Sequence, residues 1–363
     1  MAGSVMEKQR LENDVIDFSA SVNPLGTPKN IVLEIKKGLG NLIRYPDMNA
    51  TKLREKLGKT LNVDPQSIIC GNGSTELIHL IPRAMVFKKV LIVQPTFSDY
   101  ERACRIACPS CEVSYYMLDR TNNFDVESEK VIDISVKNRV EAVFLCNPNN
   151  PTGRLFPYDA LMEIAREQRA RQIYLIVDES FIDFSHGKSI ADTVEQNPYL
   201  MVLKSLTKFY GLPGLRLGYG IFPMHIAQAL NKCKEPWTVG TLTQAAGITA
   251  LNENGFKDKS ARFISGQKRI LERSFKRLGI DYVPSHTNYY LLFTPDAAEV
   301  AEYLEGRGIL IRGCSNFKGL DHRYLRVAVK SSRDNKTLLK YLKEFFFMNR
   351  GTSAPTHNSI PRQ

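Results

Sequence analysis

Short apolar runs alternate with helix-like segments through the middle of the chain. Runs that are apolar on both faces are typical of parallel strands buried under helices on each side. Ligands of such sheets bind beyond the carboxyl ends of the strands. We therefore expect an α/β fold with a mainly parallel central sheet. The six runs are SIICGNG (67–73), KVLIVQP (89–95), EVSYYML (112–118), AVFLCNP (142–148), IYLIVDE (173–179) and YLMVLKS (199–205).

The pattern changes after Trp237. Continuous helical spacing from roughly Thr241 to Leu278 predicts a long helix that connects two parts of the chain. From Asp281 onward strand-like and helix-like runs alternate, which predicts a smaller α+β domain, and the polar, proline-containing end is typical of a disordered tail. The expected parts are a segment joining the small domain (1–45), a large ligand-binding domain (46–245), the connecting helix (246–280), the small domain (281–348) and the tail (349–363).

Composition narrows the class of protein. The chain has 363 residues, of which 43% are hydrophobic, so it can bury a large core. No apolar run is long enough to cross a bilayer, and the first residues lack the hydrophobic stretch of a secretory signal. Seven cysteines, an odd number spread along the chain, are typical of reduced thiols. We therefore expect a cytoplasmic enzyme with no membrane partner.

The net charge of +11 points to an anionic ligand or partner. Lys and Arg are scattered among acidic residues along the sequence rather than gathered into a stripe with aromatic residues, which argues against nucleic acid. A cleft with fixed positive charge also concentrates phosphorylated or carboxylated small molecules. The charge is therefore compatible with an anionic substrate.

A lysine follows the last of the six runs. In LKSLTKFYGLPGLRLGYG (203–220), Lys208 follows the hydroxyls of Ser205 and Thr207 and precedes Arg216. A lysine in such a segment is usually solvated surface. An imine-forming lysine must lose its proton near neutral pH, which burial or a neighbouring cation promotes. Asp178 ends another run, at the point where the interior begins. By itself such an acid is often a helix cap or a solvated loop residue.

Two further segments follow predicted strands. CNPNNPTG (146–153) is a turn-forming run whose amides can reach a cleft, although Asn-Pro turns alone are common. ICGNGSTE (69–76) combines a strand end, a glycine turn and a helix start, which presents free N–H groups to an anion. This segment lacks the third glycine of a dinucleotide-binding fingerprint, and no Walker-type lysine follows it.

Together these four segments resemble fold-type-I enzymes that use pyridoxal 5′-phosphate (PLP), in order and in residue identity, over nearly the whole chain. The resemblance implies an aspartate-aminotransferase-like fold whose large domain (46–245) binds PLP. It implies that Lys208 carries PLP as a Schiff base and that Asp178 keeps the pyridine nitrogen protonated, so that the ring accepts electrons. It also implies a homodimer with shared active sites. The remaining implied cofactor contacts are Asn150 to the ring hydroxyl, Phe97 stacked on the ring, Tyr45 to the partner's phosphate, and Gly73, Ser74, Thr75, Ser205, Thr207 and Arg216 to the phosphate.

Two subfamilies share most of these motifs: histidinol-phosphate aminotransferase and the threonine-phosphate decarboxylase of cobalamin biosynthesis. The aminotransferase usually has a tyrosine three residues after the pairing aspartate, where this chain has Phe181. The segments IDFSASVNPLG, EPWTVG, ILIRGCSNFKGL and YLRVAVK are also more similar to the decarboxylase. The resemblance therefore implies conversion of L-threonine O-phosphate to (R)-1-aminopropan-2-yl phosphate.

One departure keeps alternatives open. The decarboxylases commonly begin with a His-Gly-Gly segment that closes over the substrate phosphate, and no such motif precedes residues 16–26. L-serine O-phosphate lacks only the side-chain methyl group of L-threonine O-phosphate. A hydrophobic pocket discriminates against the loss of one methyl group by only ~1–3 kcal/mol of binding free energy. Decarboxylation of L-serine O-phosphate to ethanolamine phosphate and histidinol-phosphate aminotransfer are therefore the alternative functions.

The same resemblance assigns the substrate groups. Arg326 would bind the α-carboxylate and Arg312 the phosphate, with Asn23 near the bound amino acid, because planar guanidinium forks match oxyanions. Arg312 can instead be half of a structural ion pair. The bond held perpendicular to the PLP ring is the one that breaks, so the placement of the carboxylate selects decarboxylation. Lys208 or a nearby tyrosine would return a proton to the α-carbon.

Three other interpretations have specific sequence features. CRIACPSC (104–111) has a cysteine spacing that an iron–sulfur cluster can use, although its cysteines can simply be buried. PLP folds also occur in regulatory proteins, but no added DNA-binding segment is evident. The six histidines show no paired ligand spacing, so we expect no metal.

Overall fold

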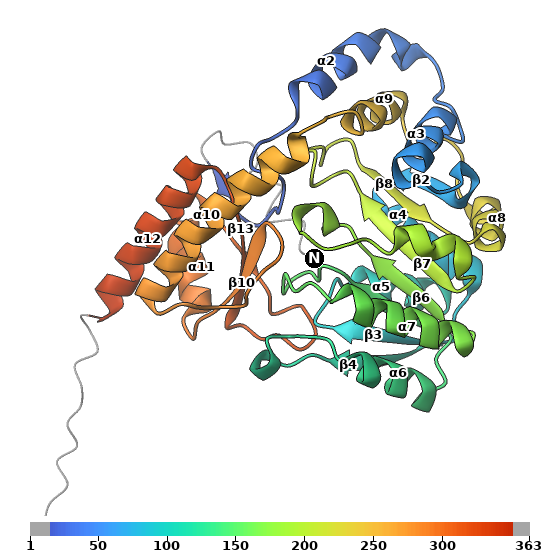
Figure 1. Cartoon of the computed structure of the whole chain (residues 1–363). Helices are drawn as coiled ribbons and strands as arrows, with labels where there is room; N and C mark the ends of the chain where they lie inside the picture. Colours follow the sequence, from blue (N-terminus) through green and yellow to red (C-terminus); the bar gives the residue numbers. More distant parts are fainter. Residues whose placement is uncertain (1–14, 351–363) are drawn as a thin grey trace, which may run out of the picture.

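The largest sheet has seven strands in the order β2-β8-β7-β6-β5-β3-β4 (Figure 1). The computed structural model describes residues 15–350. Strand β8 runs antiparallel to both of its neighbours, and the other neighbouring pairs are parallel. The predicted mainly parallel α/β sheet is confirmed. Its strands are β2 (Ile68–Asn72), β3 (Lys89–Gln94), β4 (Glu112–Met117), β5 (Ala142–Cys146), β6 (Tyr174–Asp178), β7 (Leu200–Ser205) and β8 (Leu217–Ile221).

Six of these strands coincide with the six apolar runs, and β8 is the strand that the pattern did not predict. Its sequence LGYGI contains two glycines, which interrupt a hydrophobic run and are normally read as turn residues. Gly218 has a packing reason, because a Cβ there would collide with the backbone of Gly73 and Ser74. The antiparallel strand thus lies directly against the turn that follows β2.

Helices cover both faces of this sheet, as alternate strand residues require. Leu91 and Val93 of β3 point into a core shared with α3, α6 and α7, whereas Val90 and Ile92 point into a core shared with α4, α5 and α8. Each fully buried side chain of this kind contributes roughly 1.5–3 kcal/mol of transfer free energy. The six helices are α3 (Thr51–Leu61), α4 (Ser74–Met85), α5 (Asp99–Ala107), α6 (Ser128–Lys137), α7 (Tyr158–Ala170) and α8 (Met224–Cys233).

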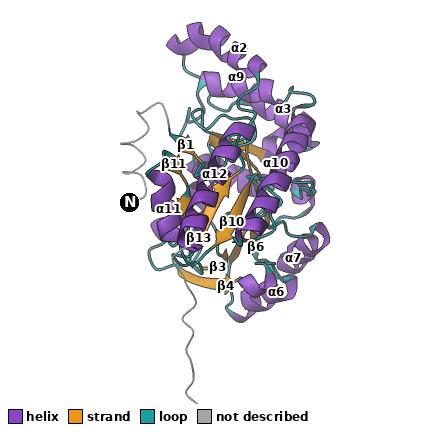
Figure 2. Cartoon of the chain, turned by 90° about the vertical axis from the view of Figure 1, so that its left-hand side faces the viewer, coloured by secondary structure: helices purple, strands orange, loops and turns teal. Residues whose placement is uncertain are grey.

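A second unit is built around a four-stranded antiparallel sheet in the order β12-β13-β10-β9. Its core joins the sheet to the long helices α10 and α12, which lie side by side in front of β10 and β13 in Figure 2. The elements are α10 (Phe256–Leu278), β9 (Asp281–Tyr282), β10 (Tyr289–Phe293), α11 (Ala297–Glu305), β11 (Ile309–Leu310), β12 (Arg312–Gly313), β13 (Tyr324–Ala328) and α12 (Ser332–Arg350).

The N-terminal segment divides between the two units. Strand β1 (Ile16–Asp17) pairs with β11 of the second unit, whereas α2 (Lys29–Gly38) packs against α9 (Thr241–Ala250). Short 3-10 helices complete the connections: η1 (Leu39–Ile43), η2 (Pro65–Ser67), η3 (Arg120–Asn122), η4 (Ile182–Phe184) and η5 (Ala191–Gln196).

The single connecting helix expected from Thr241 to Leu278 is instead two helices. Helix α9 ends at Ala250, and α10 begins after Gly255, whose φ of 75° is in the left-handed region that glycine adopts without strain. The expected tail lies outside the described residues from 351 onward, and residues 349 and 350 belong to α12. Within residues 15–350 no helix is both long and apolar enough to span a bilayer.

Candidate active site

A cavity of ≈ 330 Å³ opens at the carboxyl ends of β5, β6 and β7. Ala20, Ser21 and Val22 of the N-terminal segment and Arg326 of β13 close its other side. Because the sheet brings the strand ends together, segments that are far apart in sequence meet here. The cavity is lined by ten of the predicted residues: Ser74, Thr75, Phe97, Asn150, Asp178, Ser205, Thr207, Lys208, Arg216 and Arg326.

Lys208 lies in the cavity wall after β7. Its Nζ is 4.6 Å from the centroid of the Phe181 ring. Burial lowers the pKa of Lys208 below its usual value; the carboxylate of Asp178 opposes this shift, and the charge of Arg216 adds to it. A lower pKa increases the fraction of neutral amine near neutral pH, which is the form that attacks a carbonyl.

Asp178 is fixed at the end of β6 by two hydrogen bonds. The hydroxyl of Tyr100 donates to Oδ2 at 2.7 Å, and the amide of Ser180 donates to Oδ1 at 2.9 Å. Tyr100 lies on α5 and stacks on Phe144, with ring centroids 5.7 Å apart. Burial and the neighbouring carboxylate raise the pKa of Tyr100, so it stays a hydrogen-bond donor. These two hydrogen bonds fix the orientation of a buried carboxylate in the cavity.

The Asn-Pro loop after β5 joins the two units. Nη1 of Arg326 donates to the side-chain oxygen of Asn150, and Nη2 donates to the carbonyl of Ser19 at 2.7 Å. The hydroxyl of Tyr289 donates to the carbonyl of Asn149 at 2.8 Å. These bonds place an amide and a guanidinium side by side in the cavity.

The turn between β2 and α4 forms a cradle for an anion. Gly73 precedes α4 with a φ of 78°, and no side chain caps the first N–H groups of the helix. A Cβ at Gly73 would lie 3.1 Å from Cζ of Arg216 and closer still to Nη2, so the guanidinium lies against this turn. No carboxylate among residues 15–350 forms an ion pair with Arg216. Free amides, a helix N-terminus and an unneutralised guanidinium together suit a phosphate.

Hydroxyl groups complete the cradle. Ser180 Oγ donates to Ser74 Oγ at 3.2 Å, and the amide of Thr207 donates to Ser205 Oγ at 3.3 Å. Phe97 forms a wall of the cavity, with its ring at 5.9 Å from that of Tyr100. A carboxylate, a reactive amine, an aromatic wall and a phosphate cradle therefore fit PLP.

Four predicted residues lie outside the cavity lining: Gly73, which forms the turn before α4, and Tyr45, Asn23 and Arg312. The Tyr45 side chain is 85% exposed, with its ring 5.4 Å from that of Trp237. The amide of Asn23 is buried and donates to the carbonyl of Phe209 and to Ser260 Oγ. Arg312 donates to the side chain of Asn316 at 2.8 Å. Their roles in binding remain predictions.

Three polar residues of the site were not found from the sequence: Tyr100, Ser21, and Ser180, which bonds Asp178 and Ser74. Tyr100 lies in the quoted segment QPTFSDY, but its role depends on the helix that brings it to Asp178. Ser21 is buried and lines the cavity, and its hydroxyl has no partner among the described residues. Ser21 lies in FSASVNPLG, part of a segment that carries the family resemblance. A serine in a loop has no distinctive pattern of its own, so its place in that segment was the only signal.

The cysteines of CRIACPSC do not gather into a metal site. Cys104 lies on α5, Cys108 follows that helix, and Cys111 precedes β4. Burial raises the pKa of the Cys104 and Cys111 thiols, which makes them poor ligands and nucleophiles. Across the described part of the chain, no group of three or more His, Cys, Asp or Glu side chains could hold a metal ion.

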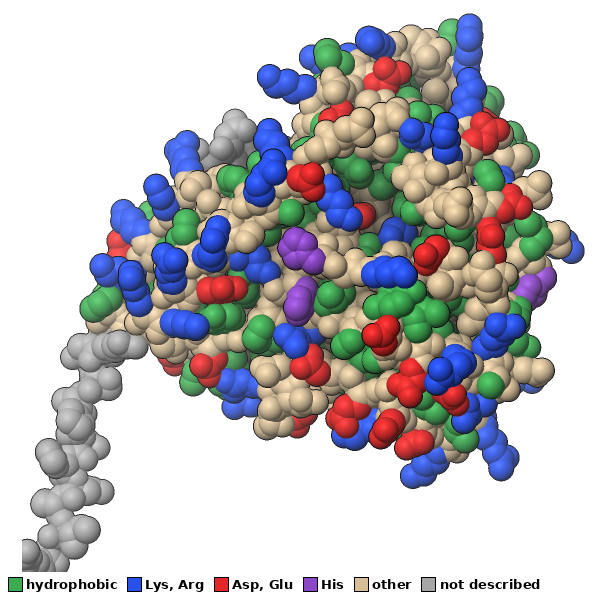
Figure 3. Space-filling view, in the orientation of Figure 1, with side chains coloured by type: hydrophobic (Ala, Val, Ile, Leu, Met, Phe, Trp, Pro, Cys, Tyr) green, Lys and Arg blue, Asp and Glu red, His purple; other side chains and the backbone are tan. Residues whose placement is uncertain are grey.

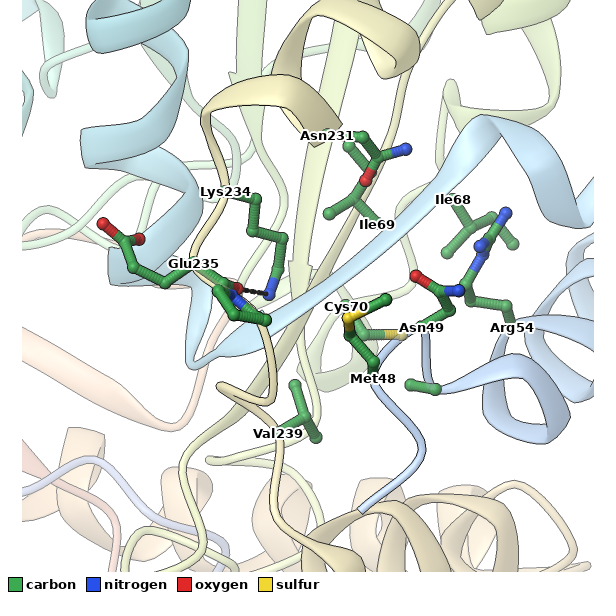
Figure 4. A pocket seen from close by; sticks show the side chains of 12 residues that line it. Met48, Asn49, Arg54, Ile68, Ile69, Cys70, Asn231, Lys234, Glu235 and Val239 are labelled. Carbon is green, nitrogen blue, oxygen red and sulfur yellow. Dashed lines mark hydrogen bonds between the residues drawn. The ribbon is translucent and has the colours of Figure 1, made fainter. Parts of the chain in front are cut away.

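A second cavity of ≈ 370 Å³ lies beside β2 (Figure 4). Lys234 points into it, donates to the carbonyl of Glu235 at 3.2 Å and pairs with Glu76 at 3.3 Å, so its charge is compensated locally. Burial raises the pKa of Cys70 in this cavity to about 12, so its thiol is inert near neutral pH. None of the predicted cofactor residues lines this cavity.

Residues 13–343 match the family model "Aminotransferase class I and II". The threonine-phosphate decarboxylase of Salmonella typhimurium is 33% identical over 91% of this chain and 91% of its own length. A histidinol-phosphate aminotransferase of Caldanaerobacter subterraneus is 34% identical over 92% of this chain and 95% of its own. A solved L-threonine-O-3-phosphate decarboxylase from Porphyromonas gingivalis superposes with a TM-score of 0.82 at 28% identity, covering 92% of this chain and all of that one.

The chain therefore belongs to the class I and II aminotransferase family and is an enzyme of the fold-type-I PLP class. Its cofactor is PLP. Within this family it is similar both to threonine-phosphate decarboxylase and to histidinol-phosphate aminotransferase, at nearly equal identity.

Proposed function

We propose that the enzyme decarboxylates a phosphorylated L-amino acid in the cytoplasm, namely L-threonine O-phosphate, to give (R)-1-aminopropan-2-yl phosphate for cobalamin biosynthesis. The observation that carries the choice of reaction is Phe181. Its buried ring packs edge-on against Tyr289, with centroids 5.0 Å apart, and forms the cavity wall beside Lys208. The aminotransferases that this chain resembles usually have a tyrosine hydroxyl here, so the ring hydroxyl of PLP depends on Asn150 instead.

Two arginines support a substrate with more than one negative charge. Arg312 of β12 and Arg326 of β13 are directly opposite each other in the antiparallel pair. Their two positive charges repel each other, and an anion bound between or beside the two guanidinium groups relieves this repulsion. We assign the α-carboxylate to Arg326, which lines the cavity, and the phosphate to Arg312, at the end of the adjacent strand.

Two unsatisfied groups support a polar ligand in the cavity. The buried Nε of Arg326 and the buried hydroxyl of Ser21 have no hydrogen-bond partner among the described residues. Leaving such a group unpaired costs about 1–3 kcal/mol, so a ligand oxygen that reaches both is favoured. We assign both to the substrate carboxylate.

PLP supplies an electron-accepting ring for the bond that breaks at the substrate α-carbon. Arg326 is held by Ser19 and Asn150, so a carboxylate bound to it has a fixed direction relative to the cofactor. Asp178 holds the proton of the ring nitrogen. Because the hydroxyls of Tyr100 and Tyr289 already donate to Asp178 and Asn149, Nζ of Lys208 is the group best placed to return a proton to the α-carbon.

We propose that the working form is a homodimer with shared active sites. Ile43 is 88% exposed and lies two residues before Tyr45, whose exposed ring is 5.4 Å from that of the exposed Trp237. Apolar surface of this kind is typical of a protein interface. Tyr45 would then reach the phosphate of the partner's PLP, as the family resemblance implies.

The test is to incubate the PLP-loaded enzyme separately with L-threonine O-phosphate, L-serine O-phosphate, and histidinol phosphate plus 2-oxoglutarate. Released CO2 and glutamate are measured in each reaction. The proposal predicts CO2 without glutamate, with L-threonine O-phosphate as the better amino acid. Preference for L-serine O-phosphate would move the assignment to that substrate, and glutamate formation from histidinol phosphate would replace decarboxylation by aminotransfer.

A further inference from the structure

The positive charge of the chain is concentrated on two helices. Helix α10 contains eight basic and two acidic residues, and α12 contains five basic and two acidic residues. Their net charge of +9 is most of the +11 of the whole chain. The sequence analysis treated Lys and Arg as scattered, because the two helices are separated by more than fifty residues and only the fold places them side by side. Figure 3 shows Lys and Arg side chains gathered over this part of the surface.

A groove of ≈ 390 Å³ lies between these helices, away from the cavity that contains Lys208. Leu278, Leu339 and Phe347 give it an apolar lining, and the Phe347 side chain is 61% exposed. Its other lining residues are Ser274 and four cations: Arg277, Lys336, Lys340 and Lys343. Among the residues that the structure describes, no acidic side chain lines the groove.

The cations of the groove are largely without counter-charges from this chain. Lys340 pairs with Glu344 at 3.9 Å across the exposed surface, which is a weak interaction. For Arg277, Lys336 and Lys343 there is no ion pair within residues 15–350. Residues 351–363, which follow α12, contain no Asp or Glu side chain. The groove therefore has an excess of positive charge around an exposed aromatic ring.

We propose that this groove, defined by Arg277, Leu278, Lys336, Leu339, Lys340, Lys343 and Phe347, binds an acidic amphipathic helix of another protein. An apolar side chain of that helix packs on Phe347 and Leu339, and its carboxylates face the surrounding lysines. A concave surface with an apolar centre and a charged rim is how proteins receive an amphipathic helix. Complementary charge speeds the encounter and selects acidic partners.

The shape and chemistry of the groove favour this occupant over other polyanions. The sugar–phosphate backbone of a nucleic acid has no apolar side chain to fill the apolar part of the groove. A membrane surface is broad and is contacted by a convex apolar face, whereas here the exposed ring of Phe347 lines a concavity between two helices. Both alternatives are included below as outcomes of the test.

The test uses the full-length, PLP-loaded enzyme and a fluorescent sixteen-residue peptide with Leu at positions i, i+4 and i+7 and mainly Glu elsewhere. Binding is measured by anisotropy at low and at physiological salt, beside a scrambled peptide of the same composition. We expect the patterned peptide to bind at least fivefold more tightly than the scrambled one. Lys336→Glu with Lys343→Glu should weaken binding at least tenfold, and Phe347→Ala at least threefold.

The matched control carries the same charge change elsewhere: Lys52→Glu with Lys59→Glu, both exposed on α3. It should alter peptide affinity less than twofold, and all variants should keep the PLP absorbance of the wild type. Equal affinity for both peptides would overturn the proposal. Tighter binding of duplex DNA or phosphatidylglycerol vesicles than of the peptide, unchanged by Phe347→Ala, would also overturn it. A tenfold gain in peptide affinity when the chain is ended after Arg350 would overturn it too, because residues 351–363 would then be the occupant of the groove.

Discussion

Replacing Gly73 by alanine should weaken PLP binding through the phosphate cradle alone. Gly73 has φ 78° and ψ 163°, a region that only glycine adopts without strain, and the added methyl group would meet the guanidinium of Arg216. Such backbone strain costs about 1–3 kcal/mol. The apo variant can relieve it by moving the turn or Arg216, and PLP binding must then restore the strained arrangement. The expected loss in PLP affinity is therefore roughly 5- to 150-fold.

The assay is a titration of the apo enzyme with PLP, followed by absorbance, beside a titration with pyridoxal, which lacks the phosphate. Gly73→Ala should weaken PLP much more than pyridoxal. Gly214→Ala is the matched control, because it lies in the loop before Arg216 and a Cβ there meets nothing within 4 Å. If both glycine variants bind PLP within twofold of the wild type, the cradle is wrongly assigned.

Three further predictions concern the cavity. Tyr100→Phe removes a charged hydrogen bond worth about 1.5–3 kcal/mol from Asp178, so turnover should fall roughly 10- to 150-fold while PLP affinity stays within threefold. Arg312→Ala should lower kcat/KM for L-threonine O-phosphate by a similar factor but change kcat/KM for L-threonine little. Arg323→Ala, at an exposed arginine, is the control. Equal losses of kcat/KM for the two substrates would contradict the phosphate assignment. The rate of PLP capture should rise with pH and level off below pH 10.5, because burial lowers the pKa of Lys208. Since the charge of Asp178 raises that pKa, Asp178→Asn should move the plateau to lower pH, and a shift to higher pH would contradict the assignment.

The central sheet and the cofactor site could both be predicted from the sequence, for the same physical reason. Buried parallel strands are continuous apolar runs, and the residues that follow them meet at one edge of the sheet. Lys208, Asp178 and Asn150 follow such runs, and the family resemblance assigned them, with Arg216, to one cofactor site, where they all line one cavity.

The parts that were not predicted depend on contacts between segments. Strand β8 contains glycines because it packs on the turn at Gly73, and no local pattern marks a strand of that kind. Tyr100 acquires its role from the position of α5, and Ser21 from the closure of the N-terminal segment over the cavity. The basic groove arises only when α10 and α12 lie together.

The most direct test of the site is to reduce the PLP-loaded enzyme with borohydride, digest it and locate the phosphopyridoxyl group by mass spectrometry. We predict modification of Lys208, together with loss of both the cofactor absorbance and CO2 release in Lys208→Ala. Modification of another lysine, or full turnover by Lys208→Ala, would contradict the assignment of this cavity as the active site.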